Sequence, residues 1–259
     1  MNLKIFQVDA FTKKIFGGNP AAICPLDEWI DAELMQKIAL ENNLSETAFL
    51  VKKDGFYELR WFTPTFEIDL CGHATLASAF VIYEVLNSAE DLLKFETKSG
   101  LLTVEKKNDL LILDFPSRPA ERSETPKGLI EAIGGTPKEI LKSRDYLMVY
   151  ESEEEIRALN PNFAELLKID AHAVIATAQG KECDFVSRFF APEVGVSEDP
   201  VTGSAHCTLI PYWAAKLGKT ELFAKQVSAR GGELFCELEG DRVKIGGHAV
   251  LYLKGEICI

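Results

Sequence analysis

Two stretches of the chain resemble each other: RWFTP at 60–64 followed by DLCGHATL at 69–76, and RFFAP at 188–192 followed by DPVTGSAH at 199–206. The two arginines lie 128 positions apart and the two glycines lie 131 apart. Chance likeness of short strings is the alternative, but the order strand, proline loop, glycine, helix is shared as well. The pattern predicts an internal duplication, with two similar α/β lobes related by a pseudo-twofold axis.

The rest of the chain alternates between strand-like and helix-like segments. In the first half we expect strands at 3–9, 21–24, 46–52, 56–63, 101–106 and 110–115, and helices at 31–42 and 73–86. In the second half we expect strands at 146–150, 173–178 and 183–190, short helices within 152–169, a helix at 204–216 and four closing strands. Asp54-Gly55 and Asn108-Asp109 predict two hairpin turns.

A polar, proline-rich segment, PSRPAERSETPK at 116–127, divides the chain and is the best candidate linker. It separates an N-terminal lobe at 1–115 from a C-terminal lobe at 128–259, whose last strand can return to the N-terminal lobe. We therefore expect two domains of similar size.

Composition excludes several classes of protein. The 259 residues are 47% hydrophobic and 26% charged, as in a soluble globular protein, and the net charge is −12. With that charge and no long basic run, nucleic acid is not an expected partner. Without an apolar run of membrane length, a signal peptide or a Cys-x-x-Cys pair, we expect a cytoplasmic protein with free thiols, no membrane partner and no structural zinc.

The duplicated glycines predict a binding site. Gly72 and Gly203 each lead into a helix, where backbone N–H groups and the helix dipole can hold a carboxylate without a basic side chain. If the two lobes face each other, both helix starts would border one cleft. A tight strand-to-helix turn explains either glycine alone, but the duplicated pair, each followed by a polar side chain, favours a site.

Four polar side chains accompany these glycines. His73 would begin a helix, where the dipole favours a neutral imidazole suited to proton relay, although a lone histidine is more often structural. Asp199 is either a turn residue or part of the same site as Ser204. Glu46 opens an apolar strand and is either an edge charge or a buried carboxylate with a chemical purpose; the residues leave both readings open. For Cys71, a buried spectator thiol is the simplest account.

Together these segments resemble the PhzF-like family of phenazine-biosynthesis isomerases, relatives of diaminopimelate epimerase. The resemblance covers nearly the whole chain and rests on the motifs DAF at 9–11, FGGNP at 16–20, SETAF at 45–49, LCGHAT at 70–75, DFP at 114–116 and EDPVTGSA at 198–205. It implies an α/β (α+β) fold of two similar lobes, each a curved, mainly antiparallel sheet around a central helix. It also implies a cofactor-free proton shift, usually in a homodimer.

The resemblance also implies roles for individual residues. Glu46 matches the general acid/base, and His73, Asp199 and Ser204 match polar residues around the substrate. Gly72 and Gly203 match the backbone donors at the two helix starts. The related epimerases use a cysteine at each glycine turn; here Cys71 stands at the first and Thr202 at the second, which disfavours a two-thiol epimerase. The stretch RGGEL at 230–234 matches the family only loosely.

The sequence thus predicts an isomerase that shifts a proton on a small carboxylate-bearing metabolite, without metal or cofactor. The alternatives are a single-base amino-acid racemase or epimerase, and a binding protein that keeps the fold without turnover. The glycine-rich nucleotide-binding motifs are missing from the sequence. The sequence names neither the substrate nor the pathway.

Overall fold

The computed structural model describes residues 2–259, which divide into two compact units. The first unit runs to Phe115 and includes the C-terminal residues Gly246–Ile259, and the second comprises Pro116–Ile245. Within the described residues, no helix combines the length and the apolar character needed to span a membrane.

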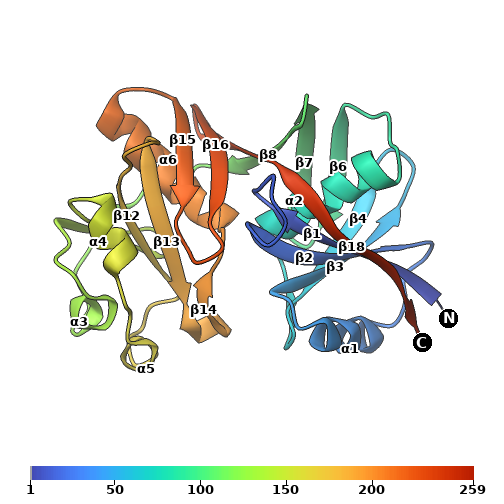
Figure 1. Ribbon diagram of the computed structural model, residues 1–259, viewed down its shortest axis with the longest axis horizontal. Helices are drawn as coiled ribbons and strands as arrows, with labels where there is room; N and C mark the ends of the chain where they lie inside the picture. The colour runs from blue at the N-terminus through green and yellow to red at the C-terminus, as the bar shows by residue number, and fades with distance from the viewer. Residues whose placement is uncertain (1) are drawn as a thin grey trace. The chain divides into compact units, whose positions relative to one another are not determined.

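The first unit joins the two ends of the chain. Strand β1 (Asn2–Ala10) pairs antiparallel with β18 (Ala249–Cys258) on one edge and with β2 (Asn19–Leu26) on the other. Figure 1 shows β1 and β18 side by side, with the two termini at the same end. The remaining elements are α1 (Ala32–Asn42), β3 (Glu46–Lys52), β4 (Tyr57–Phe62), β5 (Glu67–Ile68), α2 (Gly72–Phe80), the π-helical turn η1 (Val81–Val85), β6 (Leu92–Thr97), β7 (Gly100–Lys107) and β8 (Leu110–Pro116).

The strand pairing of this unit is mixed but mainly antiparallel. β2 is parallel to β3, and β3 is antiparallel to β4. β4 is antiparallel to β5 and parallel to β6, and β6, β7 and β8 follow as an antiparallel meander. The two predicted hairpins are confirmed as β3–β4 and β7–β8. Their turns place Gly55 and Asn108 at φ values of 81° and 58°, a region that these residue types tolerate.

Helix α2 is the buried centre of the first unit. Residues 72–79 are all buried, and the helix packs against β1, β2, β3, β7 and β18. Its hydroxyl groups bond to its own backbone, because Thr75 Oγ1 donates to Cys71 O and Ser78 Oγ to Ala74 O. The helix predicted over 73–86 is α-helical to Phe80 and continues as η1, where Leu86 N donates to Val81 O at 2.9 Å.

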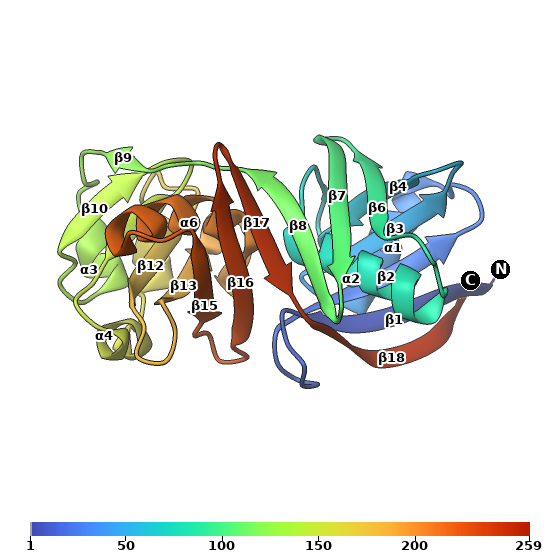
Figure 2. The same ribbon diagram turned by 90° about the horizontal axis from the view of Figure 1, so that it is seen from above.

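The second unit repeats most of the order of elements found in the first. Its elements are β9 (Glu121–Arg122), α3 (Leu129–Ile133), β10 (Glu139–Lys142), β11 (Tyr146–Val149), α4 (Glu153–Ala158), α5 (Phe163–Leu166), β12 (Val174–Gln179), β13 (Phe185–Ala191), the 3₁₀ turn η2 (Pro192–Val194), β14 (Val196–Asp199), α6 (Gly203–Leu217), β15 (Glu221–Gln226), β16 (Gly232–Glu239) and β17 (Arg242–Gly247). The repeated order runs from β10 onward, with a second short helix following α4 and with β9 and α3 added before β10. Figure 2 shows α6 in this unit, with β15 and β16 side by side.

The pairing pattern confirms the duplication. β11 is parallel to β12, β12 is antiparallel to β13, and β13 is antiparallel to β14 and parallel to β15. The strands β2 to β6 pair in the same way around the corresponding positions of the first unit. Helix α6 follows β14 just as α2 follows β5, so the two quoted stretches occupy the same topological place in their units.

The proline-rich segment is anchored to the second unit. Strand β9 pairs with β10, Ser117 N donates to Asp241 O, and Arg118 N donates to Cys207 O, the last two at 2.8 Å. The segment therefore lies along the second unit and closes over part of α6.

Candidate active site

A carboxylate and an imidazole lie in contact inside the first unit. His73 Nε2 is 3.0 Å from Glu46 Oε2, and the two side chains are only 6% and 12% exposed. Of the two readings that the sequence left open for Glu46, the structure gives the buried carboxylate. Burial next to a titratable ring is the environment in which carboxylates exchange protons.

Asn19 orients the imidazole. It is the first residue of β2, and its Nδ2 is 3.2 Å from Nδ1 of His73. Because an amide N–H donates, Nδ1 accepts, and the proton of a neutral ring then sits on Nε2. Nε2 lies 3.0 Å from Oε2 of Glu46, the first residue of the neighbouring strand β3.

The turn before Asn19 explains its position. Gly18 has a φ of +61°, and a Cβ there would lie 2.0 Å from the carbonyl oxygen of Ala10. Asp9 accepts a hydrogen bond from the backbone N–H of Phe16 at 2.8 Å, which fixes the other end of the loop. Only glycine fits at position 18, and the tight turn brings Asn19 back beside α2.

Cys71 lies on the other side of the imidazole. Its Sγ is 3.5 Å from His73 Nδ1. Burial, reinforced by the nearby Glu46 carboxylate, raises the pKa of Cys71 to about 11. The group is therefore a neutral thiol at physiological pH, a poor base and a poor nucleophile.

The pKa of His73 differs from the sequence-based expectation of a neutral ring. Burial lowers the pKa of His73, but Cys71 and Glu46 raise it by more, so that it lies well above 6.5. Since the Cys71 thiol is uncharged near neutral pH, we attribute the increase to the Glu46 carboxylate. The contact with Glu46 thus outweighs the helix dipole and favours the protonated imidazole.

The same three residues are of the types that bind zinc. One ligand atom each from Glu46, Cys71 and His73 can be chosen so that all lie within 4.8 Å of one another. A metal would have to displace the proton of the Cys71 thiol, and the raised pKa of that thiol opposes its loss.

Both helix starts leave their first N–H groups without a side-chain cap. Cys71 and Thr202 are the N-cap residues of α2 and α6; both are extended, and neither side chain makes a capping hydrogen bond. Neither helix has an acidic residue in its first turn. Gly72 and Gly203 therefore open two helices whose positive ends are available to an anion.

In the second unit, a buried glutamine fixes the loop that carries Asp199. Gln226, which is 1% exposed, donates through Nε2 to Asp199 O at 2.7 Å and accepts from Thr202 N at 2.9 Å. Thr202 Oγ1 donates to Asp199 Oδ2. The carboxylate predicted from the sequence is thus held beside the start of α6.

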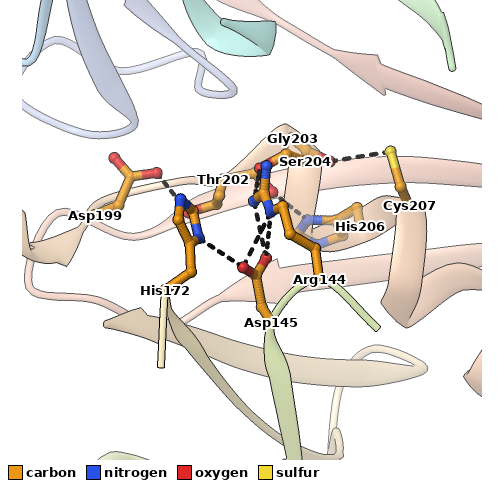
Figure 3. A network of polar contacts seen from close by, with 9 residues as sticks. All are labelled: Arg144, Asp145, His172, Asp199, Thr202, Gly203, Ser204, His206 and Cys207. Atoms are coloured by element: carbon orange, nitrogen blue, oxygen red, sulfur yellow. Dashed lines mark hydrogen bonds and ion pairs between the residues drawn. The ribbon is translucent and has the colours of Figure 1, made fainter. Parts of the chain in front are cut away.

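Ser204, the second residue of α6, contacts a chain of charged groups that the sequence reasoning missed. Arg144 Nη2 donates to Ser204 Oγ at 3.3 Å, and Arg144 also donates hydrogen bonds to both carboxylate oxygens of Asp145. The buried Asp145 contacts His172 Nδ1 at 2.8 Å. Figure 3 shows the series His172, Asp145, Arg144 and Ser204.

Only the first unit has a carboxylate at the Glu46 position. In the strand registers, Thr47 lies opposite Phe62, and Val174 lies opposite the corresponding Phe190. Glu46 therefore corresponds to Ala173. The duplication supplies two helix starts but one carboxylate of this kind.

The structure places the predicted residues in two groups. Glu46, Gly72 and His73 lie together in the first unit. Asp199, Gly203 and Ser204 lie at the start of α6 in the second. Asn19 appeared only within the motif FGGNP, and the pair Arg144-Asp145 did not appear at all; for that pair, two charged residues directly before a buried strand were the available signal.

Comparison with known proteins identifies the family of the chain. The PhzC-PhzF family model, described as phenazine biosynthesis-like protein, matches residues 8–255. A Pseudomonas aeruginosa protein named an uncharacterized isomerase is 55% identical over 257 residues, which cover 99% of each chain.

Solved structures show the same fold. The crystal structure of an Enterococcus faecalis phenazine biosynthesis protein of the PhzF family superposes with a TM-score of 0.98 at 48% identity, covering 100% of both chains. A hydroxyproline epimerase from Agrobacterium vitis has a TM-score of 0.65 at 10% identity and covers 99% of this chain and 92% of its own. The latter likeness concerns the fold alone.

Proposed function

The chain belongs to the PhzC-PhzF phenazine biosynthesis-like family and is an isomerase, and on that premise we propose that it shifts a proton within a small carboxylate-bearing molecule, without a cofactor and with Glu46 as the general acid/base. The observation that carries the proposal is the buried contact of Glu46 with His73 at 3.0 Å. A carboxylate in that environment can both accept and return a proton.

A site with a single carboxylate favours a proton shift by one base over an epimerisation that needs two opposed bases. The position of Glu46 is occupied by Ala173 in the second unit, and Thr202 stands where a second thiol would be needed. The thiol that is present, Cys71, has a pKa of about 11 and stays protonated near neutral pH. We therefore assign removal and return of the proton to one group.

The proposed reaction has two steps. Glu46 first takes a proton from a carbon adjacent to the substrate's carboxylate or double bond, and the electron pair delocalises toward the carboxylate oxygens. Glu46 then delivers that proton to another carbon of the same molecule, so that the double bond moves and no atom is lost. His73 positions the Glu46 carboxylate and shares a proton with it.

The start of α6 binds the substrate in this proposal. Gly203 and Ser204 offer backbone N–H groups, and Gly72 does so at the start of α2; such donors stabilise the negative charge that develops on the carboxylate. Asp199 contacts the polar groups of the substrate. We also propose that the protein acts in the cytoplasm and that its working form is a homodimer, which light scattering can check.

Glu46→Gln tests the proposal. A panel of small unsaturated and amino carboxylates is screened by thermal shift, and each hit is incubated with the protein in deuterated water. Wild type should incorporate deuterium and move a double bond. Glu46→Gln should bind the same hit, because the amide keeps the size of the side chain, yet lose nearly all turnover and exchange.

Two results would contradict the proposal. Glu46→Gln with near-normal exchange would exclude Glu46 as the base. Inversion of a stereocentre without movement of a double bond would instead establish a single-base racemase or epimerase on the same residues.

A further inference from the structure

Arg144 is held in place by a carboxylate that is almost inaccessible to solvent. Its Nε and Nη2 atoms donate to Asp145 at 2.8 to 3.2 Å, and the side chain of Asp145 is 4% exposed. A two-point contact of this kind fixes the plane of the guanidinium group. The Arg144 side chain itself remains 40% exposed, so a rigid cation faces the solvent.

Asp145 is shared between two cationic groups. Its Oδ1 also contacts Nδ1 of His172 at 2.8 Å, and His172 is 43% exposed. One carboxylate thus accepts hydrogen bonds from Arg144 and also contacts the His172 ring. Among residues 2–259, the two Nη1 N–H groups of Arg144 have no hydrogen-bond acceptor.

Positive charge gathers around the start of α6 although the chain as a whole carries −12. Cys207 lies one turn into α6, and burial raises the pKa of its thiol to about 11. Three nearby arginines oppose this increase by stabilising the thiolate: Arg118, Arg144 and Arg242. The first turn of α6 contains no acidic residue. This end of the helix combines a positive helix end with nearby arginine side chains.

Arg144 contacts Ser204, the second residue of α6 and a member of the proposed binding site. Its Nη2 donates to Ser204 Oγ, the side chain directly after Gly203. The first unit also has a polar contact to the residue after its helix-start glycine: Asn19, at the start of β2, contacts His73, directly after Gly72. In the first unit this contact orients a proton-transfer group, whereas in the second it brings a cation to the helix start.

We propose that Arg144 is a substrate-binding residue that recognises the carboxylate of the substrate at the start of α6, with Asp145 and His172 as its positioning residues. This inference rests on the proposed function and specifies which residue selects an acid as substrate. In this proposal the planar carboxylate of the substrate accepts hydrogen bonds from three sets of donors: the free Nη1 groups of Arg144, the Ser204 hydroxyl and the first backbone N–H groups of α6. A neutral amide or ester of the same acid lacks the charge that this arrangement recognises.

The experiment compares Arg144→Gln and Arg144→Lys with wild type. Arg157→Gln is the matched control, because Arg157 is an exposed arginine on α4 whose partner Glu153 lies within the same helix. Succinate is the probe, titrated calorimetrically, with succinamide as its uncharged counterpart. Circular dichroism and thermal unfolding confirm that each variant is folded.

We expect Arg144→Gln to weaken succinate binding by about 10- to 100-fold, the effect of losing a charged hydrogen bond. Arg144→Lys should recover part of the affinity, and Arg157→Gln should leave it unchanged. Succinamide should bind all four proteins equally weakly. With a turnover substrate, Arg144→Gln should raise KM far more than it lowers kcat. Asp145→Asn should raise KM by a smaller factor, because Arg144 is still present but its guanidinium group is no longer held in place by a carboxylate.

Equal affinity of wild type and Arg144→Gln for succinate would overturn the inference, as would failure of wild type to prefer succinate to succinamide. Either result leaves the proposed function standing if Glu46→Gln still abolishes exchange. Conversely, an active Glu46→Gln variant would overturn the proposed function even if Arg144 proves to bind the carboxylate.

Discussion

Glu46 and His73 lie 3.0 Å apart although they come from a strand and a helix separated by 27 positions, and both side chains are nearly excluded from solvent. A buried carboxylate and imidazole in contact attract each other strongly when both are charged. Removing one partner would leave the other charge buried without compensation, which destabilises a protein.

This contact predicts how stability depends on pH. The pKa of His73 is raised above 6.5, so its folded state holds a proton that the unfolded chain has lost. The sign follows from linkage: the stabilisation is complete below pH 6.5 and disappears as the pH rises through the folded pKa. The free-energy advantage of wild type over His73→Gln should therefore shrink as the pH rises above 6.5. Urea unfolding at several pH values measures it.

His206 should show the opposite behaviour and serves as the comparison. Burial lowers its pKa to about 4, and Nδ1 donates to Thr202 O at 2.8 Å. Below pH 6.5 His206 becomes protonated in the unfolded chain but stays neutral in the folded protein, so the free energy of unfolding falls between pH 6.5 and about 4. The loss attributable to this residue is about 3 kcal/mol.

His206→Asn keeps a donor for Thr202 O but cannot be protonated. Its free energy of unfolding should fall less steeply than that of wild type over the same acidic range. Parallel curves for the two proteins would show that His206 is not buried in its neutral form.

The thiol of Cys71 should be dispensable. Because its pKa is about 11, it is protonated where the protein works, and Cys71→Ser should retain substantial turnover. In folded wild type, iodoacetamide should modify the exposed Cys258 long before the buried Cys71, as peptide mass spectrometry can show. A Cys71→Ser variant as inactive as Glu46→Gln would revive a thiol mechanism.

The sequence allowed much of the fold to be predicted because its signals are local. Asp54-Gly55 and Asn108-Asp109 mark the two hairpins, and the glycine before each buried helix marks α2 and α6. Strand β10 escaped prediction because EILK is too short to show a period, whereas LLKFET in β6 does alternate, with Leu93 and Phe95 buried, and was missed. The pairing of β1 with β18 joins the two ends of the chain, which no local pattern can reveal.

The candidate site was predictable where a residue follows a motif and not where it depends on pairing between distant segments. Glu46, His73 and Asp199 stand in recognisable strings. Arg144 does not, because its role depends on Asp145 being buried and on Ser204 lying within reach of it. Its neighbourhood, KSRDY, reads in isolation as an ordinary polar turn.

A last prediction concerns the duplicated arginines. Arg60 binds both oxygens of Glu67 on β5 at 2.7 and 2.9 Å, and Arg188 binds both oxygens of Glu198 on β14 at 2.7 and 2.8 Å. Arg188 also donates to Leu159 O at 2.7 Å, which ties β14 to the end of α4. These contacts fix the two short strands that precede α2 and α6.

Glu67→Gln and Glu198→Gln form a matched pair, because each turns one accepting oxygen toward the arginine into a donor. Each should lower the free energy of unfolding by about 1–3 kcal/mol, as expected for a charged hydrogen bond left unpaired. Activity should separate them. Glu198 adjoins Asp199, so its loss should lower kcat/KM well beyond the loss of folded protein, whereas Glu67 lies four residues before Cys71 and should affect activity only through stability. Urea unfolding and steady-state kinetics on both variants decide the matter, and equal kinetic losses would mean that the Arg188–Glu198 contact does not position Asp199.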